Sequence, residues 1–494
     1  MKYIIAIDAG TTSSRAILFD HKGNQKSVAQ YEFTQYFPQN GWVEHDANEI
    51  WNTQKKALLD LIRQENLAED EIAAIGITNQ RETTVLWNRE TGEPVGKAIV
   101  WQDRRTAKMC DELKDDHEST FTSKTGLVLD PYFSGTKIKW ILDQDPELKK
   151  QAQEGKLAFG TVDSWLIWKL TDGQQHVTDV TNASRTLLFN IHTLQWDDEL
   201  LNILEIPKSI LPTVVSCSEV VGKTSNSTLG HQIKIAGIAG DQQAALFGQL
   251  CWSAGDVKNT YGTGCFCIMN TGDKAVVSKN KMLTTIGYQI GEKTTYAIEG
   301  SVFIAGALIQ WIRDELSLVN HSSEIEDLAR SVADNGGLTF IPSLTGLGAP
   351  YWEPSARGSI HGITRGTKKG HIARAALEAI ALRSYELVEA MQKDANASFA
   401  DLKVDGGASE NNLLLQIQAD VLNKCVVRPK VTETTAMGVA FFAGLAVGFW
   451  KDRQEIKSIW KENARFNPSK DRSQSDQLID TWKERIKMVL QRDE

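Results

Sequence analysis

The sequence is poor in cysteine, and its few cysteines do not form a metal-binding pattern. Six occur among 494 residues, and no two are spaced as Cys-x-x-Cys. The close pair Cys265 and Cys267 does not by itself have the spacing of a zinc site. We therefore expect reduced, buried thiols, as in a cytoplasmic protein.

Long apolar runs and blocks of like charge are also missing. No stretch reaches the roughly 18 apolar residues of a membrane span, and the apolar run before Asp8, preceded only by Lys2, is too short for a signal peptide. The formal net charge of −9 is spread along the chain, which argues against a nucleic-acid-binding surface. The rest is an ordinary globular composition, 41% hydrophobic and 24% charged, in a chain long enough for two or more domains.

The chain has no Walker A loop here, yet its first twenty residues predict another kind of phosphate site. A continuous apolar run at residues 4–7 predicts a strand buried on both faces, and a polar turn followed by a second apolar run predicts a β-hairpin. Gly10 lets a ligand approach the backbone, and the hydroxyls of Thr11, Thr12 and Ser13 can donate hydrogen bonds to phosphate oxygens. Asp8 suits a cation, with Mg²⁺ carried on the phosphates as the first choice. An ordinary tight hairpin with a polar turn is the alternative.

A second strand–turn–strand pattern lies about halfway along the chain. Residues 256–270 repeat the apolar run, the Gly-Thr turn at Gly262 and Thr263, and a second apolar run. Two such hairpins, one opening each half, suggest a duplicated domain whose two copies hold one phosphate chain from both sides. We place the boundary near residues 252–255, which predicts an N-terminal domain 1–252 and a C-terminal domain 253–494.

Two further apolar runs end in polar side chains that could hold a substrate. The run at residues 72–77 leads to Arg81 and Glu82, and the run at residues 235–239 leads through Gly240 to Asp241. Open α/β sheets bind ligands beyond the carboxyl ends of their strands, so both sets belong where a substrate would lie. Arg81 and Glu82 together offer donors and an acceptor that suit a vicinal diol. A surface ion pair and a structural helix N-cap at Asp241 are the alternatives.

Several helices are also predicted. Asp46 with Glu49 resembles a capping box at the start of a helix that runs to about Gln64, and residues 371–391 have the spacing of a buried helical stripe. The double glycine at 406–407 would let adenine or ribose approach the backbone, although a plain βα turn also favours glycine. Beyond Phe449 the chain becomes charged, which predicts a helical tail on the surface.

These motifs resemble the FGGY carbohydrate kinases over nearly the whole chain, from Tyr3 to about Trp450. Two family-wide patterns are present, at residues 132–140 and at residues 358–378. The segments that select the substrate, at residues 41–46, 79–83, 100–102 and 240–243, are similar to those of the members that phosphorylate glycerol. The resemblance implies an α/β fold of two actin- and hexokinase-like (ribonuclease H-like) domains with the active site in the cleft between them.

The resemblance also implies an activity and a set of site residues. The activity is transfer of the γ-phosphoryl group of ATP to glycerol, giving sn-glycerol 3-phosphate, with Asp241 as general base. The glycerol contacts implied are Arg81, Glu82, Trp101, Tyr132, Asp241, Gln242 and Phe266. The nucleotide contacts implied are Thr11, Thr12, Ser13, Arg15, Thr263, Gly306, Gln310, Gly407 and Asn411, and Asp8 would hold Mg²⁺ through water.

Other functions remain open on the residues alone. One is a kinase of the same class for another polyol or sugar, and another is a nucleotide-binding scaffold of the actin type without catalysis. The resemblance further suggests a homodimer or homotetramer. Many Gram-positive members that phosphorylate glycerol are activated by phosphorylation of a histidine. The matching segment here, residues 227–230, begins with Ser227 and contains no histidine, so the resemblance does not carry this regulation over.

Overall fold

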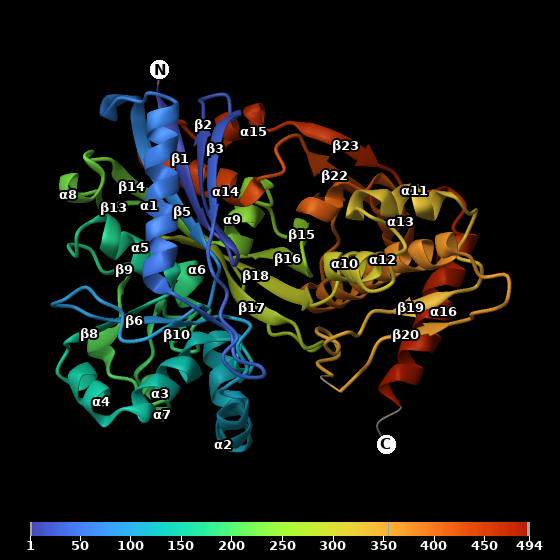
Figure 1. Ribbon diagram of the computed structural model, residues 1–494, viewed down its shortest axis with the longest axis horizontal. Helices are drawn as coiled ribbons and strands as arrows, with labels where there is room; N and C mark the ends of the chain where they lie inside the picture. Colours follow the sequence, from blue (N-terminus) through green and yellow to red (C-terminus); the bar gives the residue numbers. More distant parts are fainter. Residues whose placement is uncertain (1, 354, 492–494) are drawn as a thin grey trace.

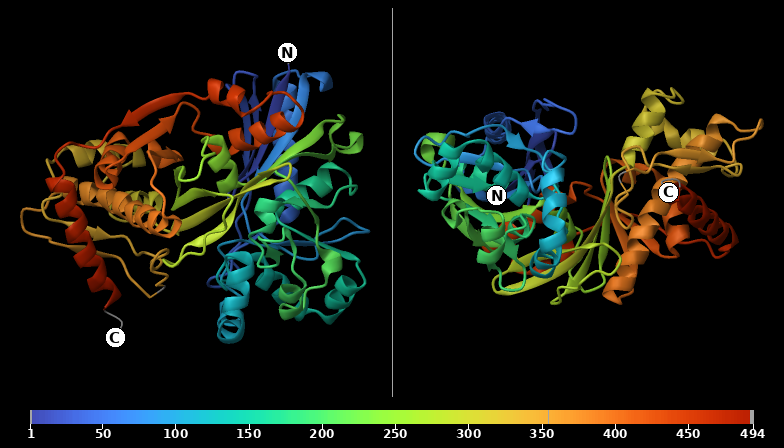
Figure 2. Two further views of the ribbon diagram at one scale, coloured as in Figure 1. Left: turned by 180° about the vertical axis from the view of Figure 1, so that it is seen from behind. Right: turned by 90° about the horizontal axis from the view of Figure 1, so that it is seen from below.

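The computed structural model describes residues 2–353 and 355–491, and it contains two large β-sheets flanked by helices. The first half of the chain forms one lobe and most of the second half forms the other (Figure 1). Seen from behind and from below, the lobes meet along one side and diverge on the other (Figure 2). The α/β class with two related domains, predicted from the sequence, is confirmed.

The two sheets share one arrangement of six strands, and the second has one more strand at its edge. The first has the order β13 (Ser218–Lys223), β14 (Lys234–Gly240), β5 (Ile72–Asn79), β1 (Tyr3–Ala9), β2 (Ser13–Phe19), β3 (Gln25–Glu32). The second has the order β17 (Leu283–Ile290), β18 (Lys293–Val302), β16 (Cys265–Gly272), β15 (Val257–Tyr261), β21 (Asp401–Asp405), β22 (Cys425–Pro429), β23 (Glu462–Phe466). In each, a central strand, β1 or β15, has an antiparallel hairpin partner on one side and a parallel strand on the other. This repeat matches the duplication expected from the two hairpins, while the boundary at residue 252 stays a prediction.

Helices and short strand pairs complete the lobes. The helices of the first half are α1 (Ala47–Gln64), α2 (Ala107–Thr125), α3 (Ser134–Gln144), α4 (Pro146–Gln153), α5 (Val162–Leu170), α6 (Val180–Ala183), α7 (Asp198–Ile203), α8 (Asn226–Leu229) and α9 (Asp241–Gly248). Those of the second half are α10 (Gly306–Asp314), α11 (Ile325–Arg330), α12 (Lys369–Ala395), α13 (Asn412–Leu422), α14 (Thr434–Ala446), α15 (Arg453–Ile459) and α16 (Ser473–Leu490). The short pairs are β4 (Glu44–His45) with β7 (Ala98–Ile99), β6 (Val85–Asn88) with β8 (Leu157–Gly160), β9 (Val177–Asp179) with β12 (Thr213–Val215), β10 (Phe189–Asn190) with β11 (Gln195–Trp196), and β19 (Thr339–Ile341) with β20 (Ser359–His361). Four short 3₁₀ turns lie within the described ranges, at Glu69–Glu71, Lys208–Ile210, Ser322–Glu324 and Gly407–Glu410.

Strand β1 is buried on both faces, as its continuous apolar run predicts. Ile5 and Ile7 pack in the cluster that contains the apolar faces of α1 and α5. Ile4 and Ala6 point to the opposite face, in the cluster that contains α9 and α14. The strand therefore anchors the hairpin tip that follows it between two layers of packed side chains.

Helix α14 belongs to the second half of the chain but packs on the first sheet, beside β1 and β5 in Figure 1. Glycines make the approach possible: a Cβ on Gly438 would lie 1.9 Å from the carbonyl oxygen of Ala244 in α9, and one on Gly76 would lie 2.4 Å from that of Val439. The two halves are thus interlocked rather than simply joined at a linker.

The structure corrects some local expectations. Helix α1 ends at Gln64 as predicted, and Asp46 caps its N-terminus by accepting from the amides of Asn48 and Glu49. The Glu49 carboxylate, however, accepts from Thr34 instead of closing a capping box. The charged tail is not purely a surface feature, because β23 joins the second sheet and α16 buries Ile479, Trp482, Ile486 and Val489. Within residues 2–353 and 355–491, no helix combines the length and hydropathy needed to cross a membrane.

Candidate active site

The ends of three parallel strands bring the predicted site residues to one place. Asn79, the last residue of β5, is paired with Ala9 of β1 on one side and with Gly240 of β14 on the other. The residues that follow, Gly10, Gln80 and Asp241, therefore leave the sheet side by side. This is the carboxyl edge at which we expected Arg81, Glu82 and Asp241 to lie.

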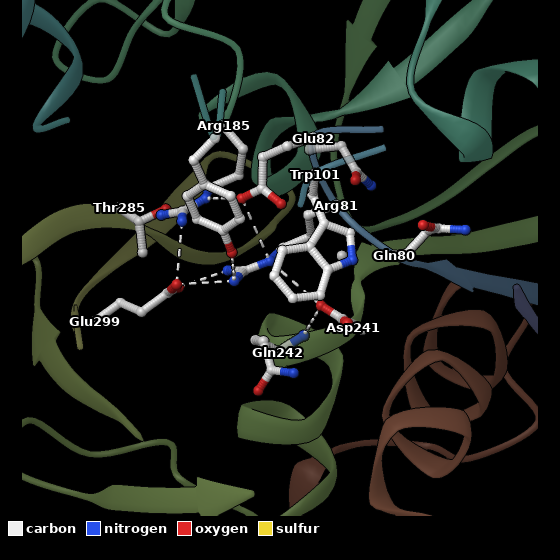
Figure 3. Close-up of polar contacts among 12 residues, drawn as sticks. Gln80, Arg81, Glu82, Trp101, Arg185, Asp241, Gln242, Thr285 and Glu299 are labelled. Carbon is white, nitrogen blue, oxygen red and sulfur yellow. Dashed lines mark hydrogen bonds and ion pairs between the residues drawn. The ribbon is translucent and has the colours of Figure 1, made fainter. Parts of the chain in front are cut away.

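Arg81 is the centre of the polar cluster (Figure 3). Its Nε lies 3.3 Å from Asp241 Oδ1 and 3.8 Å from Glu82 Oε1, and its Nη2 lies 3.3 Å from the Tyr132 hydroxyl. Arg81 and Glu82 are both almost fully buried, so the alternative of a surface ion pair is wrong.

Two residues that the sequence did not single out complete this cluster. Glu299, on β18 of the second sheet, accepts from Arg81 Nη1 at 2.5 Å and from Arg81 Nη2 at 2.8 Å. Arg185, in the polar segment after α6, donates to Glu299 Oε1 at 3.1 Å and to Glu82 Oε1 at 2.7 Å. Burial opposes ionisation of Glu299, but the charges of Arg185 and Arg81 lower its pKa to about 2. The alternating charges let four ionised side chains remain buried together.

Glu82 is held in an unusual backbone conformation. Its φ of 60° lies in the left-handed region, which is costly for a residue with a Cβ. Its carbonyl oxygen accepts from Ser134 Oγ at 3.0 Å and from Lys137 Nζ at 3.3 Å. Both donors lie within the family-wide pattern at residues 132–140, and burial lowers the pKa of Lys137 to about 7. That pattern therefore fixes the direction of the Glu82 side chain.

Asp241 is the carboxylate of the cluster that remains accessible. It is the first residue of α9, with Gly240 as the N-cap, so the alternative of a structural Asp N-cap is wrong. About a third of its side chain (32%) is exposed, while its Oδ1 accepts from the amide of Gln242 at 2.7 Å. Burial raises the pKa of Asp241 to about 6, against the opposing charge of Arg81. Such a carboxylate is mostly ionised at pH 7 and can still accept a proton.

Aromatic side chains border the same place. The ring of Trp101 lies 5.8 Å from that of Tyr132 and 6.2 Å from that of Phe266, between ring centroids. The Trp101 indole N–H also donates to the Thr11 hydroxyl at 3.0 Å. Thr11 lies at the tip of the first hairpin, and Phe266 follows the tip of the second. Trp101 therefore connects both hairpins to the residues that are predicted to contact glycerol. The structure thus brings together all seven residues that are predicted to contact glycerol, with Gln242 next to Asp241.

The first hairpin has the predicted form. Strands β1 and β2 pair with Asp8 opposite Arg15, and the turn between them exposes Thr12 and part of Thr11 and Ser13. Arg15 donates to Asp8 Oδ2 and, at 2.7 Å, to Glu433 Oε2 before α14. The predicted phosphate ligand Arg15 is therefore already held between two carboxylates, one from each half of the chain.

The second hairpin also forms as predicted, and α10 begins against it. The amide of Gly306 donates to the Gly262 carbonyl at 3.0 Å, and that of Ala307 to the Thr263 carbonyl at 3.0 Å. A Cβ on Gly306 would lie only 2.6 Å from the Gly262 oxygen, so this contact requires glycine. Thr263 is exposed at the tip, and Gln310 is exposed one turn further along α10.

The remaining nucleotide candidates lie on a separate element. Gly407 is exposed at the start of a 3₁₀ turn, and the residue that needs a left-handed conformation is its neighbour Gly406, with φ of 84°. Asn411 caps α13 by accepting from the Leu414 amide at 2.8 Å. No hydrogen bond among the described residues uses its amide nitrogen, so the capping role occupies only the oxygen end of the side chain. In the described part of the chain, neither Gly407 nor Asn411 is hydrogen-bonded to the first hairpin.

A metal site made by the protein alone is not present among the residues that the structure describes, since no group of three His, Cys, Asp or Glu side chains could hold an ion. Mg²⁺ that is carried by phosphates needs only one or two protein carboxylates. Asp8 fits this requirement, because Arg15 uses its Oδ2 and no hydrogen bond within residues 2–353 and 355–491 uses its Oδ1.

The chain is similar in sequence to known proteins. Residues 3–248 match the N-terminal domain, and residues 257–447 the C-terminal domain, of the FGGY family of carbohydrate kinases. It is 58% identical over 485 residues to a glycerol kinase of Deinococcus radiodurans, covering 98% of this chain and 97% of that one. It is 56% identical over 487 residues to a glycerol kinase of Burkholderia multivorans, with 98% and 97% covered.

Solved structures are similar as well. The crystal structure of Plasmodium falciparum glycerol kinase with ADP has a TM-score of 0.93 at 35% identity, covering 99% of this chain and 98% of that one. The ligand-bound xylulose kinase of Lactobacillus acidophilus has a TM-score of 0.90 at 25% identity, covering 100% of this chain and 99% of that one.

Proposed function

The chain belongs to the FGGY family of carbohydrate kinases, and on that premise we propose that it phosphorylates glycerol with ATP, giving sn-glycerol 3-phosphate in glycerol uptake and catabolism. The observation that carries the proposal is the accessible Asp241 carboxylate, 3.3 Å from buried Arg81, which also contacts the hydroxyl of Tyr132 in a cluster of aromatic rings. A small triol needs this combination of an acceptor for its proton, donors for its oxygens and an apolar surface for its carbons.

Asp241 acts as the general base. An alcohol is a poor nucleophile at pH 7, and a carboxylate within reach of its proton assists the attack. The hydroxyl proton moves to Asp241, the hydroxyl oxygen bonds to the γ-phosphorus, and the bond from that phosphorus to the bridging oxygen breaks, which leaves ADP. Arg81, Glu82, Tyr132 and Gln242 hold the hydroxyl groups so that one terminal oxygen faces the phosphate. Trp101 and Phe266 pack on the carbon skeleton.

The two hairpins hold the nucleotide. Phosphoryl transfer depends on positioning and on neutralising charge rather than on covalent help. We assign the phosphates to Thr11, Thr12, Ser13 and Arg15 on one side and to Thr263 on the other, with Gly306, Gln310, Gly407 and Asn411 toward the nucleoside. Mg²⁺, when bound, supplies positive charge to the phosphates, and Asp8 would hold it through water.

The decisive experiment is a coupled assay of ADP release with the purified protein and Mg-ATP. The acceptors are glycerol, dihydroxyacetone, erythritol and xylulose, the last because of the similar xylulose kinase fold. We expect glycerol to give the highest kcat/KM. A higher value with xylulose or erythritol would assign the chain to another acceptor, and ATP binding with no acceptor-dependent ADP release would indicate a scaffold.

We further propose a cytoplasmic enzyme that assembles as a homodimer or homotetramer. Light scattering on the eluting peak of a size-exclusion column tests the assembly, and a mass near the 54.9 kDa of one chain would exclude it.

A further inference from the structure

We propose that Lys258 is a positioning residue that fixes the side-chain amide of Gln242, so that Gln242 donates a hydrogen bond to the acceptor hydroxyl while Asp241 accepts its proton. Lys258 lies on β15 of the second sheet, whereas Gln242 and Asp241 begin α9 in the first half of the chain. This inference rests on the proposed function and adds a residue from the other domain to the acceptor site.

The contact between the two side chains is short and buried. Lys258 has no exposed surface (0%), and its Nζ lies 2.5 Å from Gln242 Oε1 and 2.7 Å from Thr260 Oγ1. Both partners are neutral oxygens. Burial lowers the pKa of Lys258, while the carboxylates of Asp405 and Asp241 oppose that effect and favour the ammonium form.

An ammonium group settles which end of the Gln242 amide faces it. Lys258 has three donors and no acceptor, so it requires the amide oxygen. The flipped amide would place N–H groups against the ammonium and leave a buried donor unpaired, which is costly. The Gln242 nitrogen is therefore directed away from Lys258, and in the described residues it donates to no protein acceptor.

The result is a matched pair at the start of α9. Figure 3 shows Gln242 next to Asp241, on the side of the cluster away from Arg185. A hydroxyl group has one proton to give and lone pairs that accept. Asp241 provides an acceptor for the proton, and Gln242 provides an N–H for the oxygen. With this geometry the proton is directed to the base, and the remaining lone pair is free to attack the phosphate.

Lys258 also acts on Asp241 by charge. The charged groups that face Asp241 are Arg81 and Lys258, which lower its pKa, and Glu82, which raises it. Loss of Lys258 therefore raises the pKa of the base. This gives a second readout, the acid limb of the pH profile, that a purely structural lysine would not move.

The test is steady-state kinetics of Lys258→Met, with Thr260→Val as the matched control. Methionine keeps the length and apolar stem but cannot hold the amide, so we expect KM for glycerol to rise about fivefold to tenfold, as for loss of one hydrogen bond. KM for ATP should change less than twofold, and the acid limb of kcat/KM should move to higher pH. Thr260→Val removes the other bond of the same ammonium and should leave KM for glycerol within twofold of wild type.

A double-mutant cycle separates positioning from support of the fold. If Lys258 acts through Gln242, then Gln242→Ala and the double variant Lys258→Met/Gln242→Ala have the same KM for glycerol. Effects that multiply instead would overturn the proposal, as would an unchanged KM in Lys258→Met or an equal rise in Thr260→Val.

One further variant keeps the test decisive if Lys258→Met does not fold. Gln242→Glu retains an oxygen for Lys258 but has no N–H, so its KM for glycerol should rise at least as far as that of Gln242→Ala. A wild-type KM in Gln242→Glu would refute the donor role. If the wild-type protein itself releases no ADP with glycerol, the proposed function fails and this inference falls with it. An active wild type with an unchanged Lys258→Met overturns this inference alone.

Discussion

Replacement of Asp241 by Asn tests the catalytic assignment most directly. Asparagine keeps the size of the side chain and a hydrogen-bonding oxygen but cannot take up the hydroxyl proton. The fold should survive, because Arg81 keeps its two bonds to Glu299 and the replaced side chain is a third exposed. The change is therefore expected to affect chemistry more than structure.

The magnitude follows from the role of a general base. Such a group contributes about 10²–10⁴-fold to the rate, so we expect kcat to fall by at least about 100-fold while KM for glycerol changes only severalfold. The pH profile of kcat/KM tests the role of Asp241 independently, through the pKa of the base. Because the ionised carboxylate is the active form and its pKa is about 6, wild-type kcat/KM should be near its plateau at pH 7. It should fall to about one-tenth of that plateau at pH 5, along a one-proton limb.

The assay is coupled ADP release between pH 5 and 8 at saturating Mg-ATP, with Asp198→Asn, an exposed carboxylate on α7, as the control. The limb should be present in wild type and control and missing in Asp241→Asn. A kcat within tenfold of wild type, or an acid limb that persists in Asp241→Asn, would refute the role of Asp241 as base.

Three further substitutions test the supporting structure. Glu299→Gln removes the charge between two buried guanidinium groups. Because breaking a buried ion pair costs about 3–5 kcal/mol, we expect the free energy of unfolding, measured in urea at pH 7, to fall by about 3 kcal/mol. The pKa of Glu299 is lowered from 4.5 to about 2, so the difference in free energy of unfolding between wild type and variant should shrink as the pH falls from 4.5 toward 2. A loss below about 1 kcal/mol at pH 7 would contradict the role of Glu299 as the charge partner of both arginines. Gly306→Ala forces a Cβ to within 2.6 Å of the Gly262 oxygen, so KM for ATP should rise about tenfold while KM for glycerol stays unchanged. Equal changes in both KM values would argue against a nucleotide-binding role for Gly306. Asn411→Asp keeps the helix cap but removes the amide N–H, so the melting temperature should hold while KM for ATP rises; an unchanged KM leaves Asn411 only its capping role.

The sequence was informative wherever one short segment determines both structure and chemistry. The two hairpins, the strand ends at Arg81 and Asp241, and helix α1 all follow from local runs of apolar residues and their terminal polar groups. Asp241 illustrates the limit of such patterns. The segment predicts a carboxylate at the start of a helix, but whether that carboxylate caps the helix depends on which residue takes the cap position. In the structure Gly240 takes it, which leaves the Asp241 side chain free of that role.

Residues that act across the two halves could not be predicted in this way. Arg81 and Glu82 are neighbours in sequence, so the simplest expectation pairs them with each other. In the structure the positive φ at Glu82 turns its side chain toward Arg185, while Arg81 takes Glu299 from the other sheet. No periodicity or motif connects positions so far apart.

These contacts between the two halves of the chain also explain why the site should respond to glycerol and ATP together. Trp101 donates to Thr11 of the first hairpin and contacts Phe266 beside the second, while Glu299 connects the second sheet to Arg81. Trp101 is therefore tied to the first hairpin, Phe266 lies just after the tip of the second, and Arg81 is tied to the second sheet. A movement of one sheet relative to the other would change the acceptor site and the nucleotide site at once, which is a physical reason for a kinase to place its acceptor where the two sheets meet.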